Sequence, residues 1–210
     1  MSQASITIGS LTVERLIGSA VAQAVPAVSA LRCRVFRAWP YLYDGDEAYE
    51  RAYLSDYAAS PEAVLVVAKA EDEIVGAATA APLGAHTNSF AALFESHGIA
   101  PDEVFYLGES VLDARYRGRG IGHAFFDLRE DGGRTIATAR GRPFAVFAFC
   151  GVIRPADHPL NPGNARSLEP FWRARGYTPK AGMIAPLAWR DVDQSTATNK
   201  QMQFWLRPFG

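Results

Sequence analysis

The sequence predicts a single domain of mixed α and β structure, and three observations support this. The chain has 210 residues, of which 49% are hydrophobic and 20% charged, as is typical of a globular domain with its own core. Runs rich in β-prone residues alternate with stretches of helical periodicity. Near the middle, one such run leads through a glycine-rich turn into a helix. We therefore expect one α/β domain over residues 1–210, with helices flanking a sheet.

The first half of the chain predicts a strand, two helices and an antiparallel hairpin. These elements span residues 5–13 (strand), 25–39 (helix), 47 to about 57 (helix), and 64–68 with 74–79 (hairpin). Pro26 suits the first turn of its helix, where a missing N–H needs no partner, and Pro40 stops that helix.

The second half predicts a short helix, a central strand, a longer helix, a buried strand, another helix and two final strands. The longer helix starts at residue 121, and a second helical piece covers residues 134–140. The other six elements span residues 89–98, 104–112, 143–152, 168–175, 183–189 and 201–207. The pair Gly132-Gly133 is expected to weaken or end the long helix in its middle, because glycine is a poor helix former. Gly176 closes the later helix. The last strand carries Phe204, Trp205 and Leu206, which would suit pairing across a homodimer.

Composition excludes several classes of protein. The formal net charge of -1 argues against a nucleic-acid partner, which needs a basic face. No apolar run reaches membrane-spanning length, and the N-terminus lacks a signal-peptide pattern. The two cysteines, Cys33 and Cys150, indicate reduced thiols in a cytoplasmic protein. The four histidines are scattered, so no metal site is expected.

The glycine-rich turn has the properties of an anion site. Gly118, Gly120 and Gly122 allow a sharp turn and close approach to a ligand. The helix that follows offers unpaired N–H groups and the positive end of its dipole. Arg117 and Arg119 add full charges. The expected ligand is a phosphate or pyrophosphate, although a tight turn that arginines merely keep soluble would share this composition.

The spacing of the glycines identifies the ligand more closely. The dinucleotide motif G-x-G-x-x-G/A fails, since its last position is His123 or Phe125, and no Lys-Ser or Lys-Thr completes a nucleotide phosphate loop. Residues 117–122 instead match Arg/Gln-x-x-Gly-x-Gly/Ala in full, directly after a strand. This resembles the coenzyme A pyrophosphate loop of the GCN5-related N-acetyltransferases (GNAT). The order of elements resembles that fold over nearly the whole chain.

The resemblance implies a mixed, mostly antiparallel sheet of about six to seven strands, splayed between residues 104–112 and 143–152. It also implies acetyl-CoA as co-substrate, with its pantetheine arm lying in the gap. The main-chain groups that would bind this arm belong to Val111, Leu112 and Asp113, and the Leu112 N–H would polarise the thioester carbonyl. The pyrophosphate would bind the amides of Arg117, Gly118, Arg119, Gly120, Ile121 and Gly122, with His123 beside them.

One departure from the family concerns the leaving thiolate. In the family, a tyrosine that can return a proton often precedes the Gly-Phe at the end of a late helix. Here that position holds Trp172, before Gly176 and Tyr177. An indole N–H is not a usable acid, so Trp172 is expected to pack near the thioester or shape the pocket. Tyr106, Cys150 or water remain as proton sources.

Acyl transfer to an amine also needs a base, and Glu109 is the candidate. It lies three residues before Leu112 on the central strand, facing the acceptor side. Alternatively, Glu109 bonds backbone amides or pairs with an arginine such as Arg154. His158, in a proline-bounded loop, is a possible second base or acceptor contact, or is simply structural. Arg32 and Arg34 are expected to be solvated or to pair with nearby acids.

The stretch from Trp39 to Tyr57 is rich in aromatic residues and acids. Trp39, Tyr41 and Tyr43, with Cys150 and His158, would line a pocket for a cationic or amphipathic acceptor. The alternative is that the aromatics pack a helix pair on the sheet.

Three functions follow from these predictions. The leading one is an enzyme that transfers acetyl from acetyl-CoA directly to the primary amine of a small molecule. The others are a non-catalytic acyl-CoA sensor and an acetyltransferase for protein lysines or N-termini.

Overall fold

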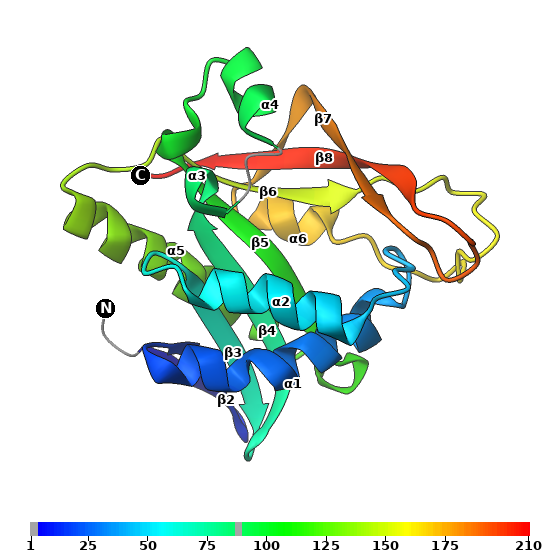
Figure 1. Cartoon of the computed structure of the whole chain (residues 1–210), viewed down its shortest axis with the longest axis horizontal. Coiled ribbons are helices and arrows are strands. Elements are labelled where there is room, and N and C mark those ends of the chain that lie inside the picture. Colours follow the sequence, from blue (N-terminus) through cyan, green and yellow to red (C-terminus); the bar gives the residue numbers. More distant parts are fainter. Residues whose placement is uncertain (1–3, 87–89) are drawn as a thin grey trace.

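The computed structural model describes residues 4–86 and 90–210, and these form one sheet covered by helices on both faces (Figure 1). The strands are β1 (Ser5–Ile8), β2 (Leu11–Leu16), β3 (Val64–Ala70), β4 (Glu73–Pro82), β5 (Val104–Leu112), β6 (Val146–Val152), β7 (Thr178–Trp189) and β8 (Thr198–Pro208). The α-helices are α1 (Ser19–Phe36), α2 (Glu47–Ala58), α3 (Leu83–His86), α4 (Ala91–Ser96), α5 (Ile121–Arg140) and α6 (Glu169–Ala174). Short 3-10 turns lie at Pro101–Glu103 and Ala114–Tyr116.

The sheet is mixed and mostly antiparallel, as predicted, but it has eight strands in the order β1-β2-β3-β4-β5-β6-β8-β7. Its one parallel pairing joins β5 to β6. The extra strand arises because the predicted first strand is a hairpin, β1 with β2, that turns at Gly9 with φ of +60°. The prediction that the last strand pairs across a homodimer is wrong. That strand, β8, lies between β6 and β7, and its Phe204 and Trp205 are buried.

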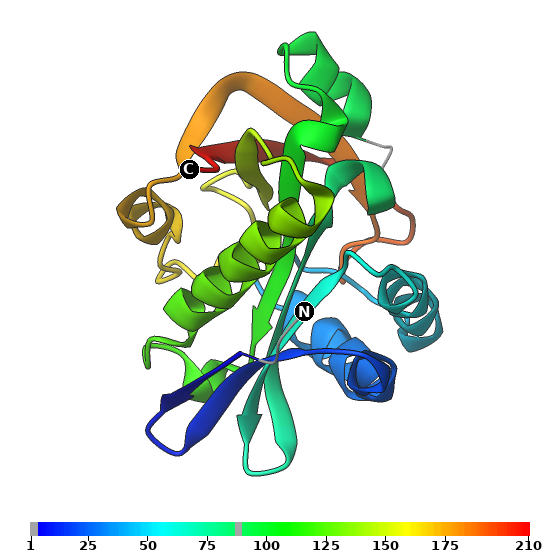
Figure 2. The same ribbon diagram turned by 90° about the vertical axis from the view of Figure 1, so that its left-hand side faces the viewer.

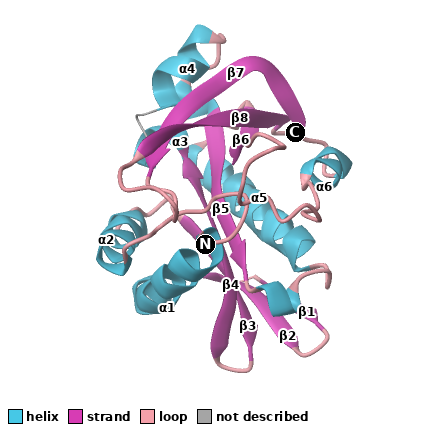
Figure 3. Ribbon diagram, turned by 90° about the vertical axis from the view of Figure 1, so that its right-hand side faces the viewer, coloured by secondary structure: helices cyan, strands magenta, loops and turns pink. Residues whose placement is uncertain are grey.

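Helices α1 and α2 cover one face of the sheet, and α5 and α6 the other (Figures 2 and 3). The α1 layer packs on β3 and β5, where Val28 and Leu31 meet Leu65 and Val111 in one buried cluster. The α5 layer buries Ile121, Phe125 and Leu128, as their helical spacing predicts. A third cluster joins α3 and α4 to β6, β7 and β8. The predicted helix over residues 89–98 is α4; its proposed start at Ser89 lies outside the described residues.

Two helix predictions need correction. Helix α1 begins at Ser19, so Pro26 lies in its interior, where the apolar face around Val25 and Val28 is buried against the sheet. Burial of that face offsets the hydrogen bond that proline cannot make. Helix α5 continues through Gly132 and Gly133, because these glycines let it approach the sheet. A Cβ on Gly132 would lie 2.8 Å from Val64, and one on Gly133 would lie 2.8 Å from the Phe105 ring.

No helix in residues 4–86 or 90–210 combines the length and apolar character that crossing a membrane requires.

Candidate functional site

Strands β5 and β6 part at the centre of the sheet, as the family resemblance implies. They pair only from Val104 to Tyr106, opposite Val146 to Ala148. Beyond that point β5 remains paired with β4 up to Leu112, while β6 remains paired with β8 up to Val152. The facing edges of β5 and β6 therefore carry main-chain groups with no ladder between them (Figure 1).

The ladder between β4 and β5 fixes which groups face this gap. The Asp113 N–H donates to the Val75 carbonyl at 2.9 Å, and Leu112 lies opposite Gly76. Since antiparallel residues alternate in direction, the main-chain groups of Leu112 point away from β4, toward the gap. Those of Ser110 point the same way. The direction predicted for the main-chain groups of Leu112 agrees with this geometry, whereas those of Val111 and Asp113 face β4. Sequence reasoning did not single out Ser110, whose main-chain groups also face the gap.

A β-bulge in β5 positions Glu109. The register shifts where Thr79 lies opposite Gly108 and Glu109, and the Glu109 N–H donates to Thr79 Oγ1 at 3.3 Å. From α5, Arg129 Nη1 donates to the carbonyls of Thr79 and Glu109, both at 3.3 Å. Arg129 is 2% exposed, and burial lowers its pKa to about 10. This guanidinium joins the two strands at the bulge from the α5 side.

On the opposite face, the carboxylate of Glu109 forms an ion pair with Arg32 of α1. Arg32 Nε also donates to Glu50 Oε2 of α2 at 2.5 Å. Burial disfavours the charge of Arg32, but Glu109 and Glu50 outweigh it and hold its pKa above the ordinary value. Arg32 is thus buried and paired, not solvated, and it is Arg32 rather than Arg154 that pairs with Glu109. Arg34 pairs with Asp113 at 3.7 Å.

Two phenols lie beside this ion pair, and a third phenol and a thiol lie next to them. The charge of Glu109, with burial, raises the pKa of Tyr53, and burial raises the pKa of Tyr41. Tyr106 and Cys150 share a hydrogen bond of 3.1 Å across the point where β5 and β6 part. Burial raises the pKa of the Cys150 thiol to about 11 and that of Tyr106 well above its usual range. All four groups are therefore neutral near pH 7.

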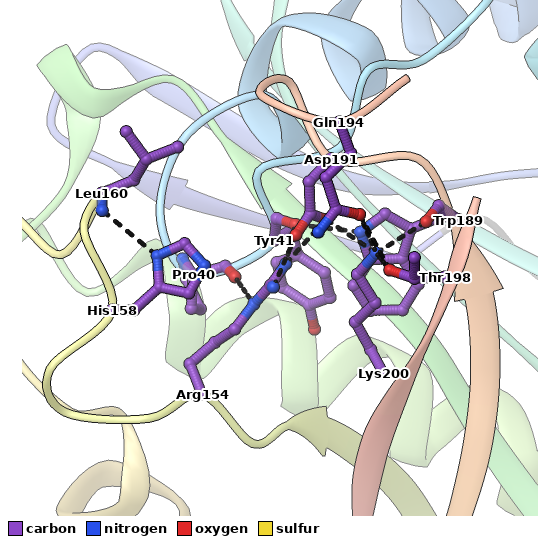
Figure 4. A network of polar contacts seen from close by, with 10 residues as sticks. All are labelled: Pro40, Tyr41, Arg154, His158, Leu160, Trp189, Asp191, Gln194, Thr198 and Lys200. Carbon is purple, nitrogen blue, oxygen red and sulfur yellow. Dashed lines mark hydrogen bonds and ion pairs between the residues drawn. The ribbon is translucent and has the colours of Figure 1, made fainter. Parts of the chain in front are cut away.

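The loop over residues 37–46 is fastened to the far end of the sheet by a buried ionic network (Figure 4). Arg154 donates to the carbonyls of Pro40 and Tyr41 at 2.8 and 2.6 Å. It also makes two hydrogen bonds, of 2.7 and 2.9 Å, to Asp191, which is fully buried. Lys200 lies 3.1 Å from the same carboxylate. The network fixes the loop that carries the predicted acceptor contacts.

The predicted acceptor residues divide between two places. The Trp39 ring lies 5.5 Å from that of His158, whose Nδ1 accepts from the Leu160 N–H at 3.1 Å. Tyr41 lies near both Cys150 and Glu109, since burial and then these two groups raise the pKa of that tyrosine. Tyr43 hydrogen-bonds Glu50 instead.

The acids beside these aromatics have structural partners. Asp44 pairs with Arg37 at 2.6 Å and with Arg190 at 2.7 Å. Asp46 caps α2 by accepting from the Tyr49 N–H at 2.8 Å. Asp44 and Asp46 thus hold the loop and the start of α2.

The glycine loop has the backbone that an anion site requires. Gly118 and Gly120 have φ of +77° and +88°, a region that other residues seldom adopt. Among the described residues, no main-chain carbonyl accepts from the N–H groups of residues 118–122. Helix α5 begins at Ile121 with no side-chain cap and no acid in its first turn. The exposed loop thus presents its N–H groups and the helix dipole to solvent.

Trp172 of α6 is packed at the side of the gap. Its ring centroid lies 5.1 Å from both Phe149 and Trp205. Gly151 of β6 makes room, because a Cβ there would lie 2.9 Å from the Trp172 ring. The following tyrosine, Tyr177, donates to Glu130 at 3.0 Å and is buried. His123 lies on the loop side, with its ring 4.9 Å from that of Phe171.

No group of three His, Cys, Asp or Glu residues within the described part of the chain is arranged to hold a metal ion.

Comparison with known proteins gives one family: the sequence model of the Acetyltransferase (GNAT) family matches residues 30–131. This range runs from α1 to α5 and includes Glu109, Leu112 and the glycine loop. The sequence matches no curated protein.

Solved acetyltransferases share the fold. One from Salmonella typhimurium, with acetyl-CoA, is 12% identical with a TM-score of 0.58, over 96% of this chain and 95% of that chain. An N-acetyltransferase from Staphylococcus aureus Mu50 is 12% identical with a TM-score of 0.57, over 95% and 99%. A ribosomal-protein-alanine N-acetyltransferase from Brucella melitensis is 15% identical with a TM-score of 0.56, over 99% of each chain.

Proposed function

Because the chain carries an acetyltransferase domain of the GNAT family, we propose that it transfers acetyl from acetyl-CoA directly to the primary amine of a small molecule. The observation that carries this proposal is that the site presents two sets of main-chain groups that have no main-chain partner within the described residues. They are those of Ser110 and Leu112 at the parted strands and the N–H groups of residues 118–122. A thioester on an amide-bearing arm that is joined to a diphosphate has polar groups for both sets.

The glycine loop is proposed to bind the diphosphate. The N–H groups of residues 118–122 and the start of α5 suit an anion. Arg117 and Arg119 contact main-chain carbonyls at 3.4 and 3.2 Å but have exposed side chains, so both remain able to reach phosphate oxygens. The pantetheine amides would then pair with Leu112 like a missing strand.

Glu109 and the edge of β5 are proposed to carry the chemistry. The amine nitrogen attacks the thioester carbonyl and gives its proton to a Glu109 oxygen, directly or through one water. The negative charge that grows on the carbonyl oxygen is stabilised by the N–H of Leu112 or Ser110. The C–S bond then breaks, and the thiolate takes a proton from water, since Trp172 offers no acid.

The acceptor is proposed to lie against the α1–α2 side, where Glu109 faces Arg32 and the neutral phenols of Tyr41 and Tyr53. The rigidly held loop of Trp39 and Tyr41 favours a small molecule over a peptide. Cys33 and Cys150 are free cysteines that form no disulfide in the described part of the chain, which suits a cytoplasmic location.

Release of free thiol from acetyl-CoA tests the proposal. The amine panel should contain 2-phenylethylamine, putrescine, an internal-lysine peptide and an alanine-ended peptide. We expect turnover with a small amine and a loss of at least about a hundredfold in Glu109→Gln. Turnover with a peptide alone would favour protein acetylation. Binding without thiol release from any amine would favour a sensor, and unchanged turnover in Glu109→Gln would exclude Glu109 as the base.

A further inference from the structure

Three charged side chains from three elements meet beside the reacting groups. Arg32 of α1 lies between Glu50 of α2 and Glu109 of β5, with side chains that are 10%, 1% and 14% exposed. The guanidinium also lies 5.0 Å from the Tyr53 ring and 5.2 Å from the Phe36 ring. One cation thus serves two carboxylates, of which Glu50 is fully buried and Glu109 is partly exposed, and the cluster carries one negative charge in excess.

The remaining groups around Glu109 do not supply the missing positive charge. From α2, Tyr53 and Tyr57 face the cluster as neutral phenols, since their pKa values are raised by Glu109 and by burial. Tyr41 faces it from the 37–46 loop, also neutral. From α5, Arg129 bonds the Glu109 carbonyl, not its carboxylate. Thr79 of β4 meets the Glu109 N–H.

Glu50 looks unnecessary if Arg32 merely balances Glu109. A fully buried carboxylate is costly unless it is paired, and Glu50 takes the Nε of Arg32 that would otherwise strengthen the pair with Glu109. Tyr43 holds Glu50 in place with a further hydrogen bond. The cluster becomes electrically neutral when one proton is added to it. This is the state that a base reaches when it has taken a proton from an amine.

Resting on the proposed role of Glu109, we propose that Arg32 and Glu50 are positioning residues that set how readily Glu109 takes up the proton of the acceptor. Arg32 orients the Glu109 carboxylate and favours its charged form. Glu50 shares Arg32 and weakens that preference. During the step the proton moves from nitrogen to a Glu109 oxygen, and no bond to Arg32 or Glu50 is made or broken.

The two residues predict shifts of opposite sign in the pH dependence of kcat. A base must be ionised to act, so activity falls on the acid side. Glu50→Gln removes the competing charge, so Glu109 holds its charge to lower pH. The acid limb of the profile, where kcat falls as the pH falls, therefore moves to lower pH by roughly one unit. Arg32→Gln leaves two carboxylates without a cation, so the limb moves up by about one unit or more. Arg32→Lys keeps the charge but cannot bridge both carboxylates, so kcat falls while the limb stays near its native position.

The experiment follows thiol release from acetyl-CoA between pH 5 and 9, with the best amine of the panel above at saturation. The ionisation of that amine is common to all variants, so differences between profiles belong to the protein. Glu47→Gln is the matched control: it is one turn before on the same helix, exposed and paired with Arg51, and should leave the limb unmoved. Thermal melting shows whether the Arg32 variants fold. If they do not, the profile of Glu50→Gln decides alone.

Opposite shifts in the two variants support the proposal. An acid limb in Glu50→Gln that coincides with that of Glu47→Gln overturns it, as do shifts of the same sign. Glu109→Gln separates this failure from a failure of the proposed function. If Glu109→Gln is inactive while the limbs do not move, Glu109 is the base and its neighbours do not tune it. If Glu109→Gln turns over normally, the base itself is misassigned and the tuning proposal falls with it.

Discussion

Replacing Asp191 with asparagine removes the negative charge at the centre of the network that fastens the 37–46 loop. The carboxylate is 0% exposed and serves both Arg154 and Lys200. Asparagine has the same shape but leaves two buried cations without an anion between them. Removing one partner of a buried ion pair costs about 3–5 kcal/mol.

The lower end of this range is expected, because both cations keep other acceptors. Arg154 retains the carbonyls of Pro40 and Tyr41, and Lys200 retains the Trp189 carbonyl at 2.7 Å. We therefore expect the free energy of unfolding to fall by about 3 kcal/mol, and Tm by about 6–12 °C in a chain of this size. The KM for the amine should rise because the loop carries Trp39 and Tyr41. The Kd for CoA should not change.

Asp44→Asn is the control, measured by thermal and urea unfolding under the same conditions. Asp44 also pairs with two arginines, Arg37 and Arg190, but at the surface, where solvent screens the charges. Its Tm should stay close to the native value. Equal melting of the two variants, or a change in CoA affinity that matches the change in amine KM, would refute this account of the network.

Gly133→Ala should destabilise the protein by about 1–2 kcal/mol, since its Cβ would press on Phe105 and this outweighs the gain in helix propensity; Thr138→Ala, exposed on the same helix, should change unfolding little. Arg129→Met should lower kcat and Tm together, because two carbonyls at the bulge lose their donor, and near-native kcat would contradict that role. Cys150, with a pKa of about 11, should react with iodoacetamide at pH 8 at least about a hundredfold slower than in the urea-unfolded chain. Peptide mass spectrometry would measure this, and equal rates would contradict the burial argument.

The strands and the glycine loop were predictable because their signals are local. The bounds of β5 follow from β-prone residues at 104–107 and 111–112, and the loop from the spacing of three glycines. The hairpin of β1 and β2 was missed because a single glycine, Gly9, makes the turn inside an otherwise strand-like stretch. Gly132 and Gly133 led to the wrong prediction that the helix weakens or ends there. Their role is to let α5 pack closely on the sheet, and helix propensity carries no information about such packing.

The charged residues of the site could not be paired from sequence, because their partners come from distant elements. A local signal was nevertheless present. Arg32 lies on the same helical stripe as Val28 and Val35, and Arg129 on the stripe of Phe125. A charge on an apolar stripe is costly unless a partner meets it in the core, so such positions point to buried ion pairs or capped carbonyls. The sequence does not say which acid or carbonyl that partner is.

Titration of CoA by calorimetry, with Gly120→Glu and Gly120→Gln as a matched pair, tests the central claim most directly. Both variants strain the backbone at φ of +88° equally, but only glutamate opposes the diphosphate with a charge. The account predicts binding to the native chain and at least about tenfold weaker binding to Gly120→Glu than to Gly120→Gln. No heat with the native chain, or equal affinities for the pair, would contradict it.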